Sequence, residues 1–169
     1  MAEAGIFRPD DRVELIDGEI YDMVPIGSGH AGKTDRLNRA FARAFAEGLV
    51  HVGVQRPLRL DALNELQPDL MLLKPRTDDY QRGHPAPADV LLLIEVSDSS
   101  LSYDRKTKLP LYAKFGVPEV WIVNLTEGSV EVYREPAADA YAARDRLSAG
   151  WLAPVLLPGV AVDVAALFG

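Results

Sequence analysis

The sequence predicts an α+β (α/β) domain in which helices and strands surround one sheet. Two short apolar runs, Asp69 to Leu73 and Val90 to Val96, are typical of buried strands. The second run is apolar along its whole length, which favours a central strand covered on both faces. Helical periodicity of the apolar residues occurs over Lys33 to Glu47 and again over Tyr103 to Phe115.

The remaining elements follow from turn signals and alternation. Asp17-Gly18 is the strongest short hairpin signal and lies between two alternating runs. Pro110 should kink the second helix or delay its start. In chain order we expect a hairpin over 12–25, a helix over 33–47, strands over 52–60, 69–73 and 90–96, a helix over 103–115, a strand pair over 120–123 and 130–133, edge strands near 141–156 and a helical turn over 164–168.

Length and composition narrow the class of protein. The 169 residues predict a single domain, residues 1–169, large enough to bury a core. The lack of cysteine excludes a disulfide framework, a thiolate zinc site and a cysteine nucleophile, and it suits a reducing cytoplasm. No apolar run is long enough to span a membrane and the start is not a signal peptide, so we expect a cytoplasmic protein. The net charge of −7 disfavours nonspecific binding to nucleic acid or anionic membrane.

Three residues form a candidate catalytic set. Glu95 interrupts a buried strand near its end, where an unpaired carboxylate is costly, so it needs a cation or a basic side chain as a partner. Asp69 follows Pro68 at the start of another strand, and the two carboxylates converge if these strands pair. Two carboxylates and a backbone carbonyl form a hard oxygen site suited to Mg²⁺. Lys108 on the next helix, or alternatively Lys106, could stabilise charge on a phosphate or position a water.

Each of these residues also has a structural interpretation. A Pro-Asp pair usually forms a turn. A glutamate in a buried strand often pairs with an arginine, and a helical lysine usually faces solvent. Only the combination of the three favours a functional site.

A set of short motifs along nearly the whole chain, from Gly5 to Phe168, resembles one known family. The motifs are Arg12 to Glu19, Met23, Pro25, His30, Pro68-Asp69, Ile94-Glu95-Val96-Ser97, Asp104, Lys108, Tyr112 and Gly116 to Val123. In this order they resemble the Uma-two family of restriction endonucleases, which belongs to the PD-(D/E)XK nuclease superfamily. The resemblance implies a restriction-endonuclease-like fold, in which helices flank a central mixed sheet, and metal-dependent hydrolysis of DNA phosphodiester bonds.

The resemblance also implies roles for individual residues. Asp69 and Glu95 match the two acids of the motif and, with the Val96 carbonyl, would hold Mg²⁺ or Mn²⁺. Ser97 stands where the motif has lysine, and Lys108 matches the position to which the family moves that lysine. Further family positions that would support the site are matched by Glu14, His30, Gln55 and Asp104.

The expected partners of such a site are DNA and a second copy of the chain. Arg36, Arg39 and Arg43 lie on one flank of the first helix and could hold the DNA backbone, although a solvated helix face has the same pattern. A homodimer would suit a nuclease that cuts two strands. A nuclease-fold module without catalysis, acting only through interactions, is an alternative.

A second motif predicts a different function. The segment Gly27 to Thr34 matches G-x-x-x-x-G-K-[ST], the phosphate-binding loop, and lies between a predicted strand and a predicted helix. The preceding segment is a hairpin arm with polar residues, whereas a phosphate-loop strand is central and apolar. The nucleotide-binding alternative is therefore the weaker one.

Overall fold

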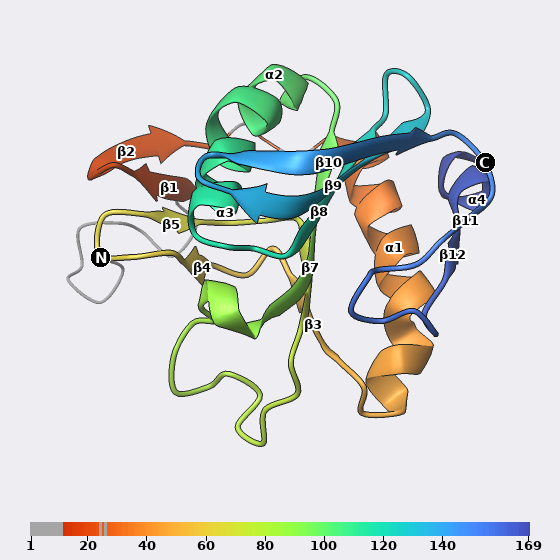
Figure 1. Cartoon of the computed structure of the whole chain (residues 1–169), viewed down its shortest axis with the longest axis horizontal. Helices are drawn as coiled ribbons and strands as arrows, with labels where there is room; N and C mark the ends of the chain where they lie inside the picture. The colour runs from red at the N-terminus through yellow and green to blue at the C-terminus, as the bar shows by residue number, and fades with distance from the viewer. Residues whose placement is uncertain (1–11, 24, 26) are drawn as a thin grey trace.

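The computed structural model describes residues 12–23, 25 and 27–169. Its centre is a six-stranded mixed sheet with the strand order β10-β9-β8-β7-β6-β3 (Figure 1). The pair β7 and β8 is parallel, and the other neighbours are antiparallel. The strands are β3 (His51–Val54), β6 (Leu70–Leu73), β7 (Val90–Ser97), β8 (Glu119–Asn124), β9 (Ser129–Ala137) and β10 (Ala140–Leu147).

Two smaller sheets accompany the main one. Their strands are β1 (Val13–Ile16), β2 (Glu19–Asp22), β4 (Leu58–Arg59) and β5 (Glu65–Leu66) in the order β2-β1-β5-β4, and the pair β11 (Trp151–Leu152) and β12 (Val162–Asp163). Asp17 and Gly18 join β1 to β2 with φ values of 49° and 81°. Two successive residues with positive φ make the turn that matches strand twist, which is why this pair predicts the hairpin.

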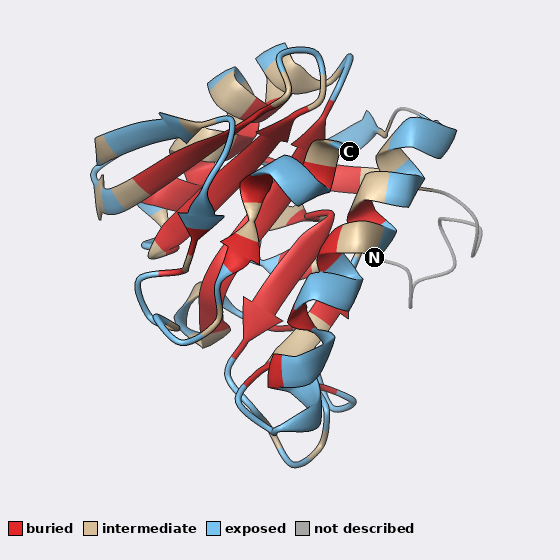
Figure 2. Cartoon of the chain, turned by 90° about the vertical axis from the view of Figure 1, so that its right-hand side faces the viewer, coloured by how far each residue is buried: buried red, intermediate tan, exposed pale blue. Residues whose placement is uncertain are grey.

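Helices cover both faces of the main sheet, as predicted (Figure 1). The helix α1 (Ser28–Ala46) buries Leu37, Phe41 and Ala44 against one face. The segment that includes α3 (Leu109–Lys114) covers the other face with Leu111 and Tyr112. Figure 2 shows the central strands of the main sheet buried and the outward side of α1 exposed. The short helices η2 (Pro87–Asp89) and α4 (Val164–Phe168) complete the chain, and no helix in the described residues is long and apolar enough to cross a membrane.

The connection between the parallel strands β7 and β8 contains an unusual helical turn. Three pieces follow without a break: α2 (Leu101–Tyr103), the π-helical turn η3 (Asp104–Lys108) and α3. The Leu109 amide donates to the carbonyl of Asp104, five residues back. Pro110 lacks an amide proton and its ring collides with the carbonyl four residues earlier, so a regular α-helix cannot run through this position. The wider turn before the proline accommodates the kink that the sequence predicts.

Some boundaries differ from those predicted. The first helix begins at Ser28 rather than at Lys33, because its glycines are tolerated in the exposed first turns. The strand predicted over 52–60 is divided into β3 and β4. Gln55 lies between them with a φ of 46°, a left-handed conformation that ends the strand.

Candidate active site

The ends of β6 and β7 bring two carboxylates together. Leu70 pairs with Ile94 in the antiparallel register of these strands, so one step further along the register places Asp69 opposite Glu95. Opposed residues of an antiparallel pair project from the same face of the sheet. Asp69 Oδ2 also accepts a hydrogen bond of 2.8 Å from the amide of Val96. The sequence hypothesis that these acids meet at one sheet end corresponds to this geometry.

Glu95 lies in a buried polar environment under the continuous segment formed by α2, η3 and α3, residues 101–114, which we call the helical segment. Its Oε1 accepts a hydrogen bond of 2.6 Å from the Tyr112 hydroxyl and forms an ion pair of 2.8 Å with Lys108 Nζ. Burial raises the pKa of Glu95 to about 8, because it outweighs the opposing effect of Lys108, and the charges of Asp104 and Asp69 add to the rise. The cost of burial therefore favours the protonated form of Glu95, and the charge of Lys108 opposes that effect.

Lys108 lies between two carboxylates. Its Nζ is 2.8 Å from Glu95 Oε1 and 3.0 Å from Glu14 Oε1, and its side chain is 4% exposed. Burial alone would lower the pKa of Lys108, but the charges of Glu95, Glu14 and Asp104 raise it well above the ordinary value. Lys106 is exposed. Of the two lysines considered from the sequence, Lys108 is thus the one that the fold places beside the acids, and it is protonated there.

Glu14 connects the N-terminal hairpin to the site. Its Oε1 accepts from the Gln67 amide at 2.9 Å, and its Oε2 accepts from the Tyr103 hydroxyl at 3.0 Å. With the ion pair to Lys108, both oxygens of this buried carboxylate are occupied by groups of the protein. Glu14 therefore positions Lys108.

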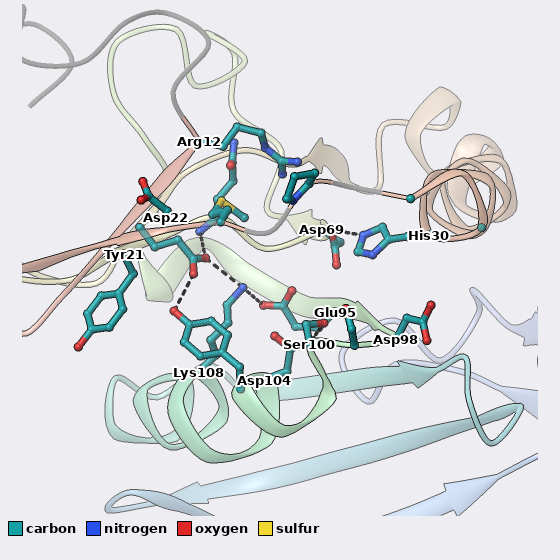
Figure 3. Close-up of a pocket in the computed structure, with 18 residues that line it drawn as sticks. Arg12, Tyr21, Asp22, His30, Asp69, Glu95, Asp98, Ser100, Asp104 and Lys108 are labelled. Carbon is teal, nitrogen blue, oxygen red and sulfur yellow. Dashed lines mark hydrogen bonds and ion pairs between the residues drawn. The ribbon is translucent and has the colours of Figure 1, made fainter.

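His30 and Asp104 flank the central acids. His30 extends from the first turn of α1, and its Nε2 lies 2.7 Å from Asp69 Oδ1 (Figure 3). Asp104 accepts hydrogen bonds from the hydroxyls of Ser97 at 2.6 Å and Ser100 at 2.8 Å. Burial raises the pKa of Asp104 despite the opposing effects of Lys108 and the two serines.

These groups face a pocket of about 600 Å³. In Figure 3, Arg12 and Tyr21 lie on one side of the pocket and the helical segment lies on the other. The described lining residues include six acids, Glu14, Asp22, Asp69, Glu95, Asp98 and Asp104, but besides His30 only two basic residues, Arg12 and Lys108. An anionic substrate entering such a pocket requires additional positive charge.

Comparisons with known proteins identify the family. A model of the Uma2 (Uma-two) family, described as putative restriction endonuclease, matches residues 2–165. The chain belongs to the Uma2 family. The solved structures include a similar fold, that of a putative nuclease of the DUF820 group from Anabaena variabilis. It has a TM-score of 0.76 and 15% identity, and the match covers 98% of this chain and 94% of that chain. The comparison with curated proteins gives no match.

The donor atoms of this Uma2 site are hard oxygens, which suits Mg²⁺ or Mn²⁺. No three histidine, cysteine or acidic side chains within the described ranges are arranged to hold a metal ion. The set predicted from the sequence consists of only two side chains, Asp69 and Glu95, with the Val96 carbonyl. Both protein contacts of Glu95 are made by Oε1, so Oε2 is the oxygen that can face a cation. The residues therefore fit an ion that keeps several of its waters.

Gln55 does not reach this Uma2 pocket with its side chain. Its backbone amide instead donates to the Asp69 carbonyl at 2.9 Å, and its own carbonyl accepts from Gln67 Nε2 at 2.6 Å. The sequence predicts no role in the site for Gln67, which lines the pocket, for Tyr103, or for Tyr112, which enters only as a motif residue. The spacing of Tyr112, four residues after Lys108 on a helix, was the available signal.

The arginines of α1 also lie outside the pocket. Arg36 Nη1 donates to the carbonyl of Ala166 at 2.7 Å and to that of Gly169, so it binds the end of α4. Arg43 pairs with Glu47 at 2.8 Å, one turn along the helix, and Arg39 is exposed. DNA contact by Arg36, Arg39 and Arg43 stays a prediction. Arg36 already binds carbonyl groups at the end of the chain.

The structure contradicts the phosphate-loop alternative. Residues from Ser28 to Thr34 lie in the first turns of α1 rather than in a loop. The Ala31 amide donates to the Gly27 carbonyl at 3.0 Å, and Thr34 Oγ1 donates to the His30 carbonyl at 3.1 Å. A phosphate loop needs backbone amides turned toward the anion and a central parallel strand before it, whereas β2 is an antiparallel edge strand.

Proposed function

We propose that this chain is a divalent-metal-dependent endonuclease that hydrolyses DNA phosphodiester bonds. Membership of the Uma2 family supports a nuclease. One observation carries the proposal: Asp69 and Glu95 project from one face at adjoining strand ends, with protonated Lys108 2.8 Å from Glu95. We place the activity in a single domain, residues 1–169, and in the cytoplasm.

Each residue then has a role. Asp69, Glu95 and the Val96 carbonyl would hold Mg²⁺ or Mn²⁺, which supplies Lewis-acid polarisation of the phosphate and a water of lowered pKa. Lys108 acts as a hydrogen-bond donor and positive charge toward the phosphate oxygens, a role that suits the raised pKa of this lysine. His30 orients Asp69, and Glu14 orients Lys108.

Metal-dependent cleavage of supercoiled plasmid DNA tests the proposal. Asp69→Asn, Glu95→Gln and Lys108→Met should each lower the cleavage rate at least about a hundredfold, because each removes a group that acts on the reacting phosphate. Lys106→Met is the matched control, since this lysine lies in the same helical turn but is exposed, and it should keep the wild-type rate. Full cleavage by Glu95→Gln would show that the carboxylate pair is not the catalytic centre.

The charge balance bears on how DNA would approach. The chain has a net charge of −7, and its pocket is mostly acidic, so we expect the metal and a second protomer to contribute to binding. We propose a homodimer, because cleavage of both strands of a duplex then uses two identical sites. Sedimentation equilibrium tests this expectation: a mass of one chain across the micromolar range would exclude the dimer.

A further inference from the structure

A second buried charged cluster lies beneath the helical segment and outside the pocket. At its centre is Glu131 on β9, which is fully buried. Its carboxylate accepts hydrogen bonds from Arg105 Nε at 3.1 Å and from Arg105 Nη2, from the Tyr133 hydroxyl at 2.6 Å, and from Asn124 and Arg144 at 3.3 Å each. Burial alone would raise the pKa of Glu131, but the hydrogen bonds from Arg105, Tyr133 and Asn124 hold it below the ordinary value.

Arg105 belongs to the π-helical turn that also carries site residues. It lies between Asp104 and Lys108 in the sequence, and all three are part of η3. Tyr103, just before this turn, and Lys108 both contact Glu14. In a regular α-helix, two residues five positions apart are rotated by about 140° about the axis and cannot reach one carboxylate. A turn closed by a bond from residue i+5 to residue i brings them to the same side, so the site depends on the π geometry.

The π turn needs contacts that hold it in place. Such turns are rare and occur mostly as single turns, because the α form is the more favourable one for most sequences. Pro110 explains why the turn lies where it does, but it does not fix the rotation of the turn relative to the sheet. A bidentate arginine–carboxylate pair fixes both distance and plane. Glu131 is on a central strand, and Arg105 is the described residue of η3 that pairs with it.

We propose that Glu131 is a positioning residue of the site, which acts through Arg105 to hold the π turn and thereby sets the placement of Lys108 and Asp104. This inference rests on the proposed nuclease function. It predicts that loss of the Arg105–Glu131 pair changes the orientation of Lys108 without moving the backbone of Asp69, just before β6, or of Glu95, within β7. Turnover should therefore suffer more than metal binding.

Steady-state cleavage separates these effects. Glu131→Gln and Arg105→Gln should each lower kcat about tenfold or more, because small misplacements of a catalytic group have effects of this size. KM and the Mn²⁺ affinity should change less than about threefold. Arg105→Lys, which keeps the charge, should restore part of the rate. Arg144→Gln is the matched control, since Arg144 binds the same carboxylate from β10 and not from the helical segment, and it should keep the wild-type kcat.

Amide hydrogen exchange supplies a readout that needs no turnover. The amides of residues 104–109, which include the bond from Leu109 to Asp104, should exchange faster in Glu131→Gln and Arg105→Gln than in Arg144→Gln. The double variant should be no slower in cleavage than the worse single variant, because both remove one interaction. Arg105 is 34% exposed, and in its variant Glu131 keeps the hydrogen bonds from Tyr133, Asn124 and Arg144.

The outcomes distinguish this inference from the proposed function. A wild-type protein that cleaves no DNA with Mg²⁺ or Mn²⁺ refutes the proposed function. Amide exchange then still tests whether the Arg105–Glu131 pair holds the π turn. Unchanged exchange of residues 104–109 in Arg105→Gln overturns that part of the inference. Faster exchange with wild-type kcat overturns the positioning role. Equal losses of kcat in Glu131→Gln and Arg144→Gln also overturn it, because they indicate general damage to β9 and β10.

Discussion

Replacing Glu95 by glutamine should stabilise the folded protein progressively as the pH rises. The carboxyl group is buried and its pKa in the folded state is about 8, against an ordinary value of 4.5. Between these values the unfolded chain has released the proton that the folded chain still holds. Stability therefore falls as the pH rises through this interval, and it is level below about 4.5 and above about 8.

The size of the effect follows from the same two values. They differ by about 3.5, and one pKa unit corresponds to about 1.4 kcal/mol, so ionised Glu95 destabilises the folded state by at most about 5 kcal/mol at pH 9. Glutamine keeps an acceptor for Tyr112 and Lys108 but does not ionise. Replacing the protonated carboxyl group by an amide adds an offset that does not depend on pH. The free energy of unfolding of the glutamine variant, relative to that of the wild type, should thus rise by several kcal/mol between pH 5 and pH 9.

Urea unfolding at pH 5, 7 and 9 in EDTA measures this difference. Glu131→Gln is a control of opposite character, because the pKa of Glu131 lies below its ordinary value and the group stays ionised over this range. The free energy of unfolding of Glu131→Gln should lie below that of the wild type by the same amount from pH 5 to pH 9. A constant difference for Glu95→Gln as well would show that Glu95 is ionised throughout, and the reasoning from burial would be refuted.

Three further predictions concern residues around the site and on α1. His30→Ala should weaken Mn²⁺ binding about tenfold in calorimetry, because Asp69 loses the partner that orients it; an unchanged affinity would contradict this role. Arg36→Ala should lower the free energy of unfolding by about 1 kcal/mol and leave plasmid cleavage within twofold, since Arg36 binds the end of α4; a large loss of DNA affinity would instead support a DNA contact. The wild-type protein should show no ATP binding in calorimetry, because Lys33 lies within a helix and not in a phosphate loop; ATP binding that Lys33→Ala abolishes would revive the nucleotide alternative.

Local signals in the sequence carried most of the fold and the two acids. The turn Asp17-Gly18, the apolar run Val90 to Val96 and the helical periodicity each depend on neighbouring residues, so they can be interpreted without tertiary contacts. Glu95 was informative for the same reason, because a charge in an otherwise apolar strand requires a partner wherever the strand lies. Asp69 became a candidate only in combination with Glu95 and Lys108, because a Pro-Asp pair alone usually forms a turn.

The rest of the site depends on contacts between distant segments. The buried ion pairs of Lys108 join it to Glu14 on the hairpin and Glu95 on β7, and no local pattern specifies them. The contact of Arg36 with α4 joins residues more than a hundred positions apart. Pro110 is the sequence signal for the π turn. It predicts that the helix is disturbed there but does not predict a π turn.

The buried contacts of Lys108 also bear on when the site comes into existence. The three charged groups Glu14, Glu95 and Lys108 come from β1, β7 and η3. The chain between β7 and the parallel strand β8 must be complete before η3 can pack against the sheet. A growing polypeptide therefore has no assembled centre until it has been synthesised past residue 124 and has folded. If the proposed nuclease function holds, unfinished and unfolded chains would lack the centre that cleaves.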